Sequence, residues 1–534
     1  MDDHPYLRRL CDGTVKQLSP FTGTEVWTVP GRANRPLRLP QVEVRPLSSH
    51  MHTHTCAFCS GRYLETPPEY ARIVRFASVK DDDDASADAG SGNAGAAAAG
   101  AGAAGGQGTK AGAKAADADA GAGAAGANAR LGANTGAGAA GGQGTKAGAK
   151  AADADAGAGA AGANARLGAN TGAGDTWHTF FGLLPEYLDQ SVADFRRIPN
   201  LFEILPFNYW QANYGFKLPE RCRDRLENYL ADAAGYEHLR AIVSAKLRAS
   251  GAGDTEIAEL NLSDIRRHSA GFFGGSHDVL VARRHWRDDA VDTTGLAGSA
   301  TLSVTEHRVW TQWAVNAMHA QYLQNKHVKY VAVFQNWLRP AGASFDHLHK
   351  QVVGVDSLGA SLQAEIARVN ANGNIYRDFV DWAYRAGLVV AANDGAVALA
   401  GVGHRYPSLE VYSTGPVSEP WLMEPEQVDA VSDLVHALHQ ATGTQVPLNE
   451  EWHYRAPGVA KEMPWRVVLK WRVSTLAGFE GATKIYLNTI DPRSLRERVV
   501  RELEQLRASQ AGALAPGIRI GDECEQPYLQ YGRA

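Results

Sequence analysis

The sequence lacks the features that membrane proteins and nucleic-acid-binding proteins need. Its 534 residues carry a formal net charge of only −5, which gives no case for a nucleic-acid or membrane-surface partner. No apolar run reaches the roughly 18 residues that predict a transmembrane helix. The N-terminus lacks the basic and then apolar pattern of a signal peptide. A chain of this length has room for roughly two to four domains.

Cysteine is also scarce. Cys11, Cys56, Cys59, Cys222 and Cys524 form an odd, scattered set that is unlike a disulfide framework, so we expect a reducing, cytoplasmic setting. Cys56 and Cys59 form one Cys-x-x-Cys pair after a histidine-rich segment. That pair suits a redox site, half of a structural zinc site, or two ordinary reduced thiols. Zinc would need two further ligands from elsewhere in the chain.

Residues 81–174 lack aromatic side chains altogether. They are mostly alanine and glycine, and the segment 100–138 recurs residue for residue at 136–174, a period of 36. A solenoid repeat must bury a hydrophobic face, whereas this one offers a single leucine per unit, so we predict a disordered insert in a folded domain. A fibrous or phase-separating segment is the alternative. Because long surface insertions are tolerated, we expect deletion of 81–174 to leave activity intact.

Outside this stretch, apolar residues recur with both helical and strand spacing. Helical spacing is found at 221–249, 306–325, 426–440 and 494–508. Short apolar or β-branched runs predict strands at 278–282, 328–333, 352–355, 464–473 and 484–488. This mixture predicts an α+β fold in which helices cover antiparallel sheets.

The stretch between the two strands at 328–333 and 352–355 carries the strongest chemical signal. Two histidines at i and i+2, His347 and His349, point to the same face of an extended segment. A paired imidazole site beside a serine, an asparagine and a glutamine could bind and attack a phosphate. The alternative is a polar strand edge with two ordinary hydrogen-bonded histidines.

This stretch closely resembles the active-site segment of galactose-1-phosphate uridylyltransferases, a branch of the histidine-triad superfamily. That family has a phenylalanine, an asparagine two residues later, a Gly-x-Ser, and then His-Pro-His-x-Gln. The matching residues occur here in the same order and spacing: Asn336, Gly342, Ser344, His347, His349 and Gln351. Leu348 stands where the family usually has proline.

The resemblance implies a zinc site next to the nucleophile. In the family, the first histidine of the pair ligates zinc together with the Cys-x-x-Cys and a histidine that follows a strand. Cys56, Cys59 and His347 match these positions, and the remaining ligand is either His285 or, as the second choice, His277. Four protein ligands leave no open position, so this zinc would be structural and would not activate water.

The resemblance also supplies binding residues. Arg32 and Arg35 match arginines near the nucleotide phosphates, and the fork of a guanidinium suits phosphate oxygens. Asn200, in a Pro-Asn-x-Phe loop, matches an asparagine near the nucleotide, and Glu480 matches a residue that holds the sugar. Some transferases carry a second metal in the second half. The strand at 465–471 has no histidine, so we expect no second metal here.

The expected fold has two histidine-triad-like halves. Residues 1–80 and 175–356 would form the half that carries the active site and zinc, residues 81–174 the insert, and residues 357–534 the second half.

The implied activity is transfer of a nucleoside monophosphate from a nucleotide sugar to a sugar 1-phosphate. His349 would form a covalent nucleotidyl-histidine, Gln351 would donate to a phosphate oxygen, and Ser344, Asn336 and Gly342 would bind the phosphates. Alternatives are an adenylyl-type nucleotide-sugar phosphorylase, a hydrolase, and a non-catalytic zinc-containing nucleotide-binding module. Nucleotide sugar and sugar phosphate are the expected partners, and a homodimer is possible because family members are often dimers.

Overall fold

A long antiparallel sheet forms the body of the protein. The computed structural model describes residues 3–31, 43–77, 165–166, 175–509 and 511–531. Within these residues the larger sheet has thirteen strands. Their spatial order is β18 (Arg519–Ile520), β12 (Val389–Ala392), β13 (Ala396–Ala400), β14 (Ser408–Ser413), β16 (Arg466–Trp471), β15 (Leu448–His453), β10 (Tyr330–Trp337), β11 (His349–Val355), β9 (His277–Ala282), β8 (Phe195–Pro199), β5 (Ala71–Ala77), β7 (Asp175–Phe181) and β6 (Ala165–Arg166). The predicted α+β class is confirmed.

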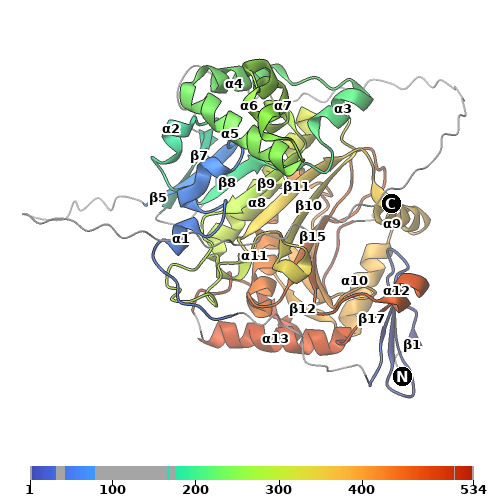
Figure 1. Ribbon diagram of the computed structural model, residues 1–534. Coiled ribbons are helices and arrows are strands. Elements are labelled where there is room, and N and C mark those ends of the chain that lie inside the picture. The colour runs from blue at the N-terminus through green and yellow to red at the C-terminus, as the bar shows by residue number, and fades with distance from the viewer. Residues whose placement is uncertain (1–2, 32–42, 78–164, 167–174, 510, 532–534) are drawn as a thin grey trace, which may run out of the picture. The chain divides into compact units, whose positions relative to one another are not determined.

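A smaller sheet joins the two ends of the chain. It consists of β1 (Asp3–His4), β2 (Leu7–Arg9), β3 (Val15–Leu18), β4 (Glu25–Thr28) and β17 (Ile485–Leu487). The pair between β4 and β17 is parallel, and Figure 1 shows these strands beside the short helix α12 (Gly478–Thr483). The N-terminal strands thus pair with a strand of the C-terminal half, although the sequence groups residues 1–80 with the N-terminal half.

Helices cover the large sheet on one side. The covering helices are α8 (Val304–Gln324), α11 (Pro425–Thr442) and α13 (Pro492–Ser509), close to the ranges predicted from periodicity. The alternation along β10 sends Val331 and Val333 into the core that these helices close. Residues two apart on β11, beginning with His349, face the opposite side of the sheet. His349 is therefore on the face that α8 and α11 leave free.

The remaining helices form two further groups. α4 (Glu220–Ala231), α5 (Ala233–Ala249) and α7 (Leu262–Gly274) share their own core and lie at the top of Figure 1 with α6 (Asp254–Ala258). α9 (Gly359–Ala371) and α10 (Ile375–Arg385) pack with the small sheet. α1 (Met51–His54), α2 (Pro185–Leu188) and α3 (Phe207–Tyr214) are short. No described helix is long and apolar enough to cross a membrane.

One predicted helix is in fact two. The helical pattern at 221–249 is interrupted at Asp232, which has an extended backbone, with φ −80° and ψ 130°. Its carboxylate accepts a hydrogen bond from the Gly235 N–H and caps α5. A short acidic residue that competes for backbone donors therefore ends the helical run there.

The two halves predicted from the sequence share one sheet. β10 pairs with β15 from Phe334–Glu451 to Trp337–Leu448, so the large sheet continues across the predicted boundary at residue 356. The division into two halves remains a prediction.

The predicted insert connects two neighbouring strands. β5 and β7 pair from Ala71–Phe181 to Ala77–Asp175, so the residues that flank the segment 78–174 lie directly opposite each other. Only Ala165–Arg166 of that segment is described, as the edge strand β6 paired with β7, and there the chain is extended where the sequence predicts disorder. The other residues of the predicted insert lie outside the described residues.

This pairing agrees with the expectation that the insert can be removed. We expect a variant in which residues 78–174 are replaced by Asn-Gly to fold and to keep the wild-type activity, because a two-residue turn closes an antiparallel pair. Its Tm should lie within about 4 °C of the wild-type value, a change of about 1–2 kcal/mol. Thermal unfolding and turnover check this; an insoluble or inactive variant would show that the segment has a structural role.

Buried histidines lie between the helices and the covered face of the sheet. His436 on α11 donates its Nε2–H to the Leu302 carbonyl at 2.8 Å, and burial lowers its pKa to about 4. The titratable and charged groups around it are His307 of α8, His439 of α11, Lys350 of β11 and Glu450 of β15. Lys350 and Glu450 form a fully buried ion pair.

The free energy of unfolding should therefore fall in mild acid, because His436 is held neutral in the folded protein. Above about pH 6.5 His436 is neutral in both the folded and the unfolded state. As the pH falls from about 6.5 toward 4, only the unfolded state binds the proton, so up to about 3 kcal/mol of folding free energy is lost. His436→Gln keeps a side-chain donor, and we expect it to flatten this pH dependence, measured by denaturant unfolding. His52→Gln, outside the core, is the control; parallel curves for all three proteins would contradict the assignment.

Candidate functional site

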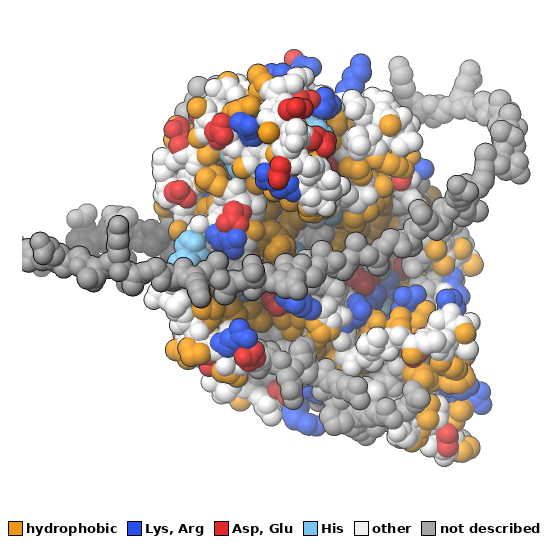
Figure 2. Space-filling view, viewed as in Figure 1, with side chains coloured by type: hydrophobic (Ala, Val, Ile, Leu, Met, Phe, Trp, Pro, Cys, Tyr) orange, Lys and Arg blue, Asp and Glu red, His pale blue; other side chains and the backbone are white. Residues whose placement is uncertain are grey.

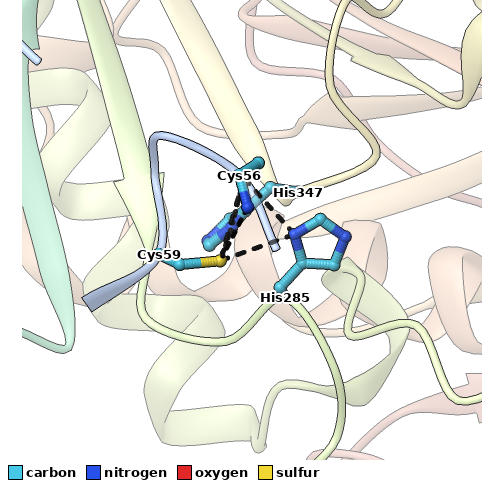
Figure 3. Close-up of side chains that lie close together, drawn as sticks. All are labelled: Cys56, Cys59, His285 and His347. Atoms are coloured by element: carbon cyan, nitrogen blue, oxygen red, sulfur yellow. Dashed lines mark hydrogen bonds between the residues drawn. The ribbon is translucent and has the colours of Figure 1, made fainter. Parts of the chain in front are cut away.

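Four predicted metal ligands come together. Cys56, Cys59, His285 and His347 converge with their donor atoms all within 4.8 Å of one another (Figure 3). The two sulfurs are 3.8 Å apart, far beyond the length of a disulfide. The Nδ1 atoms of His285 and His347 lie 3.4 and 3.5 Å from Cys56 Sγ, and 3.7 and 3.8 Å from Cys59 Sγ.

These distances fit a tetrahedral metal site. Zinc bond lengths of about 2.3 Å to sulfur and about 2.0–2.1 Å to nitrogen place tetrahedral ligands about 3.8 Å apart for two sulfurs and about 3.6 Å apart for sulfur and nitrogen. The observed separations match both values. This group could therefore bind a metal ion, and its two sulfur and two nitrogen donors suit zinc.

Local structure holds each ligand in place. Cys56 and Cys59 lie between α1 and the 3-10 helix η1 (Ser60–Glu65), and the Cys59 N–H bonds back to the Cys56 carbonyl at 3.0 Å. His285 follows β9 by three residues and His347 precedes β11 by two. His347 donates its Nε2–H to the Ala282 carbonyl at 2.7 Å, which leaves Nδ1 for the cluster. The hydrogen bond between the two thiols lowers the pKa of Cys59 and raises the pKa of Cys56, so Cys59 is the first of the pair to give up its proton.

His349 has the geometry of a nucleophile. It begins β11, its side chain is buried, and its Nδ1–H donates to the His347 carbonyl at 2.7 Å. That bond fixes the tautomer with a lone pair on Nε2, and Nε2 has no hydrogen-bond partner among the described residues. Burial lowers the pKa of His349 to about 4, so the ring is neutral near pH 7. Phe58, between the two cysteines, packs 5.5 Å from this ring.

Gln351 contacts residues that the sequence assigns to other roles. Its Oε1 lies 2.9 Å from Nε2 of His277, and the Asn200 amide nitrogen lies 3.1 Å from that same Nε2. His277 is therefore not in the metal cluster, and the structure favours His285 over His277 as the third ligand. Asn200, predicted near the nucleotide, and Gln351, predicted to donate to a phosphate oxygen, are brought together through His277.

The loop before His347 has unusual backbone conformations. Leu338 has φ 65° and ψ 156°, a region that is essentially restricted to glycine, and Gly342 has φ 89°. Between them lies the 3-10 helix η3 (Arg339–Ala341), and Ser344 follows with an exposed side chain. Such backbone conformations are common in ligand-binding loops. The loop that contains Leu338 and Gly342 leads directly to Ser344, the predicted phosphate-binding serine.

Two cavities flank this loop. One, of about 670 Å³, is lined by Cys56, His285 and Ser344 together with Arg62 and Arg339. The other, of about 560 Å³, is lined by Asn336, Asn449, Glu451 and Arg472. Figure 2 shows hydrophobic side chains gathered in a hollow between the helices at the top of the molecule and its lower part. Histidine side chains lie at the surface near α1 in the same view.

Asn336 is held by Asn449 of β15 and, through it, by Arg472. Asn449 donates its amide to the Asn336 Oδ1 at 2.7 Å and to the Ala341 carbonyl at 2.8 Å. Arg472 in turn donates to the Asn449 Oδ1 at 2.6 Å. Since Oδ1 of Asn336 is engaged, its amide hydrogens are the end left for a ligand. Sequence reasoning missed Asn449 and Arg472, because only the pairing of β10 with β15 brings them to the site.

Other predicted residues lie elsewhere or cannot be placed. Arg32 and Arg35 lie outside the described residues. Glu480 is buried, and its Oε2 accepts the Ala477 N–H at 3.0 Å, capping α12. Figure 1 draws α12 beside β17 and the N-terminal strands, away from α1 and β11. The structure therefore does not bring Glu480 to His349 within one chain, and its sugar-binding role remains a prediction.

A buried arginine lies between two carboxylates in the part of the chain after residue 356. Arg466, on β16, donates to Glu365 at 2.9 Å and to Glu410 at 3.2 Å. The charge of this guanidinium compensates the two buried carboxylates. The expectation that no second metal binds in this half remains a prediction.

Comparisons with known proteins find distant likenesses. An ADP-glucose phosphorylase from Arabidopsis thaliana with bound ADP-glucose is 14% identical, with a TM-score of 0.47, over 91% of this chain and 97% of that one. A GalT-like protein from Arabidopsis thaliana is 17% identical over 42% of this chain and 74% of that one, with a TM-score of 0.36. A uridylyltransferase is 16% identical over 43% and 76%, also with a TM-score of 0.36.

The GalT-like protein and the uridylyltransferase are named for the family that the sequence resembles. No curated protein matches the sequence. A family model described as a domain of unknown function (DUF4921) matches residues 10–92 and 161–531.

Proposed function

The chain belongs to the DUF4921 family, whose description assigns no activity, and we propose from its site that it is a nucleotidyltransferase acting on nucleotide sugars. The observation that carries the proposal is the environment of His349. Its Nδ1–H is held by the His347 carbonyl, which directs the unprotonated Nε2 away from the backbone. A neutral imidazole oriented in this way can attack phosphorus and later leave when protonated.

The reaction would proceed in two displacements. In the first, Nε2 of His349 forms a bond to the α-phosphorus, and the bond from that phosphorus to the bridging oxygen breaks. Sugar 1-phosphate leaves with the electron pair. In the second, a phosphate oxygen of the acceptor attacks the same phosphorus, the P–N bond breaks, and His349 is restored. The acceptor is either another sugar 1-phosphate or inorganic phosphate, because both present the same nucleophilic oxygen.

Other residues would bind and neutralise the diphosphate. The Gln351 amide would donate to a non-bridging oxygen, and Ser344, Asn336 and the Gly342 backbone would contact the β-phosphate. Arg32 and Arg35 would offset the charge of the diphosphate. Ser344 lines one of the two cavities beside the loop and Asn336 lines the other, so each would contact the substrate from its own side of the loop.

Zinc would be held by Cys56, Cys59, His285 and His347. When bound, it supplies a structural cross-link and leaves no coordination position for substrate. His347 is shared between the two functions, because its ring belongs to the metal cluster and its carbonyl orients His349. His347 therefore links the position of the metal cluster to the orientation of the proposed nucleophile, His349.

Exchange of labelled sugar 1-phosphate tests this function. Incubating the protein with UDP-glucose or ADP-glucose and labelled glucose 1-phosphate, without any second acceptor, should move label into the nucleotide sugar. Any enzyme that transfers the nucleotidyl group to a sugar 1-phosphate gives this exchange, with or without a covalent intermediate. A binding module gives no exchange, and a hydrolase releases nucleoside monophosphate instead; either result would reject the proposal. The donor that exchanges identifies the base.

A further inference from the structure

His277 contacts Gln351 and no metal ligand. It begins β9, its side chain is 2% exposed, and Val353 is its partner across the β9–β11 pair. Gln351 lies two residues earlier on β11, on the same face of the sheet. The distance of 2.9 Å between His277 Nε2 and Gln351 Oε1 is that of a hydrogen bond.

Backbone geometry fixes the tautomer of His277. The Ile204 N–H points at its Nδ1 from 3.2 Å, and a backbone N–H can only donate. Nδ1 must therefore accept, and in the neutral ring the proton is on Nε2. Burial lowers the pKa of His277, which agrees with a neutral ring. Nε2–H then donates to the Gln351 side chain, so the atom that it meets must be the amide oxygen.

The orientation of the Gln351 amide follows from this bond. With Oε1 occupied by His277, the NH₂ group is the end that remains for a ligand. A flipped amide would place NH₂ against the Nε2–H of His277, leaving two donors facing each other. His277 therefore decides whether Gln351 presents hydrogen-bond donors or an acceptor to its ligand. A phosphate oxygen needs donors.

The same histidine holds the loop that carries Asn200. The Asn200 N–H donates to the His277 carbonyl at 2.8 Å, and the Ile204 N–H donates to its ring. Asn200 Oδ1 accepts the Phe202 N–H at 2.9 Å, and its amide nitrogen lies 3.1 Å from His277 Nε2, where the Nε2–H offers it no acceptor. His277 thus holds the Asn200 loop through two backbone N–H groups and orients one predicted phosphate-binding amide, that of Gln351.

We propose that His277 is a positioning residue that fixes the Gln351 amide with its NH₂ toward the α-phosphate of a nucleotide sugar. The inference rests on the proposed function, since it assigns the phosphate as the ligand of Gln351. His277 contacts no reacting atom in this account; it acts through Gln351. Its substitution should therefore reduce turnover at saturating donor more than it changes KM for the donor.

Phosphorothioate donors test the proposal. The Sp and Rp α-thio analogues of UDP-glucose or ADP-glucose place sulfur at one or the other non-bridging position, and sulfur accepts hydrogen bonds poorly. The wild type should prefer one diastereomer in the exchange assay, and Gln351→Ala should reduce that preference about tenfold, the value of one charge-assisted hydrogen bond. His277→Leu should reduce it equally, and the double variant should be no worse than Gln351→Ala alone.

Matched variants separate positioning from general damage. His277→Gln keeps a donor near the position of Nε2, so it should restore most of the preference. His277→Asn is too short to reach Gln351 and should lose the preference even if His277→Leu does not fold. His238→Leu removes another buried histidine, which bonds the Thr66 carbonyl and Tyr229, and should lower Tm with the preference unchanged.

The outcomes distinguish the inference from the proposed function. A wild type that exchanges label, with an unchanged diastereomer preference in His277→Leu or His277→Asn, overturns the role of His277 alone. A further loss in the double variant beyond Gln351→Ala overturns it as well, since His277 would then act independently of Gln351. A wild type that gives no exchange with either donor overturns the proposed function and this inference with it.

Discussion

Replacing His349 with glycine is expected to reduce turnover of nucleotide sugar by about 10⁴-fold or more, and free imidazole is expected to restore part of it. The substitution removes the atom that attacks phosphorus, while the His347 carbonyl and Phe58 still shape the space that the ring leaves. Imidazole that enters this space can take the nucleotidyl group and carry it into solution. The measurement is turnover with and without imidazole, together with detection of nucleotidyl-imidazole.

A matched variant excludes a general effect of imidazole. His327→Gly removes a histidine from the segment between α8 and β10, where its ring stacks on Tyr214. It should keep wild-type turnover and show no response to imidazole. Comparable turnover in His349→Gly and the wild type would contradict the assignment of the nucleophile. If His349→Gly keeps the wild-type Tm but loses all turnover and does not respond to imidazole, the idea that imidazole can enter the space left by the ring would be contradicted.

Removing the metal from the Cys56 cluster is expected to destabilise the whole active-site half. Cys56 and His285 are 229 residues apart in the chain, and Cys56 and His347 are 291 apart, so one ion ties together three distant segments. A loss of about 4 kcal/mol, well below what zinc contributes in zinc-finger peptides, would lower Tm by roughly 10 °C. Turnover should fall together with zinc content, because His347 orients His349.

Metal analysis and thermal unfolding check this expectation. The wild type should contain one zinc per chain, and Cys59→Ser should contain much less and unfold at lower temperature. Cys222→Ser is the matched control, since Cys222 is buried in the separate core of α4, α5 and α7 and should leave zinc content unchanged. Equal Tm values for the zinc-loaded and chelator-treated wild type would show that the cluster has no structural role.

Local sequence patterns predicted the elements that carry the site. The periods of strands and helices depend on neighbouring residues, so β9, α8, α11 and α13 were predicted close to their observed bounds. β10 runs on to Trp337 and β11 begins at His349, both beyond the predicted strands at 328–333 and 352–355. The four residues of the metal cluster were chosen through the family resemblance, because spacing in the chain contains no information about ligands 229 residues apart.

The contacts that could not be predicted from the sequence are those that depend on strand register. His277 was weighed as a metal ligand because it is a histidine near the right strand; its position opposite Val353 sends it to Gln351. Asn449 reaches Asn336 only because β15 pairs with β10. The alternation within each strand was available in the sequence, but the partner and the register of each strand were not.

The most direct test of the account is the intact mass of the protein after brief incubation with UDP-glucose and, separately, with ADP-glucose. The account predicts a mass gain of one uridylyl or one adenylyl group with the donor that supports exchange, and no gain in His349→Ala. The same gain in His349→Ala, or a folded, zinc-containing wild type that never gains mass while it turns over donor, would contradict the covalent nucleotidyl-histidine.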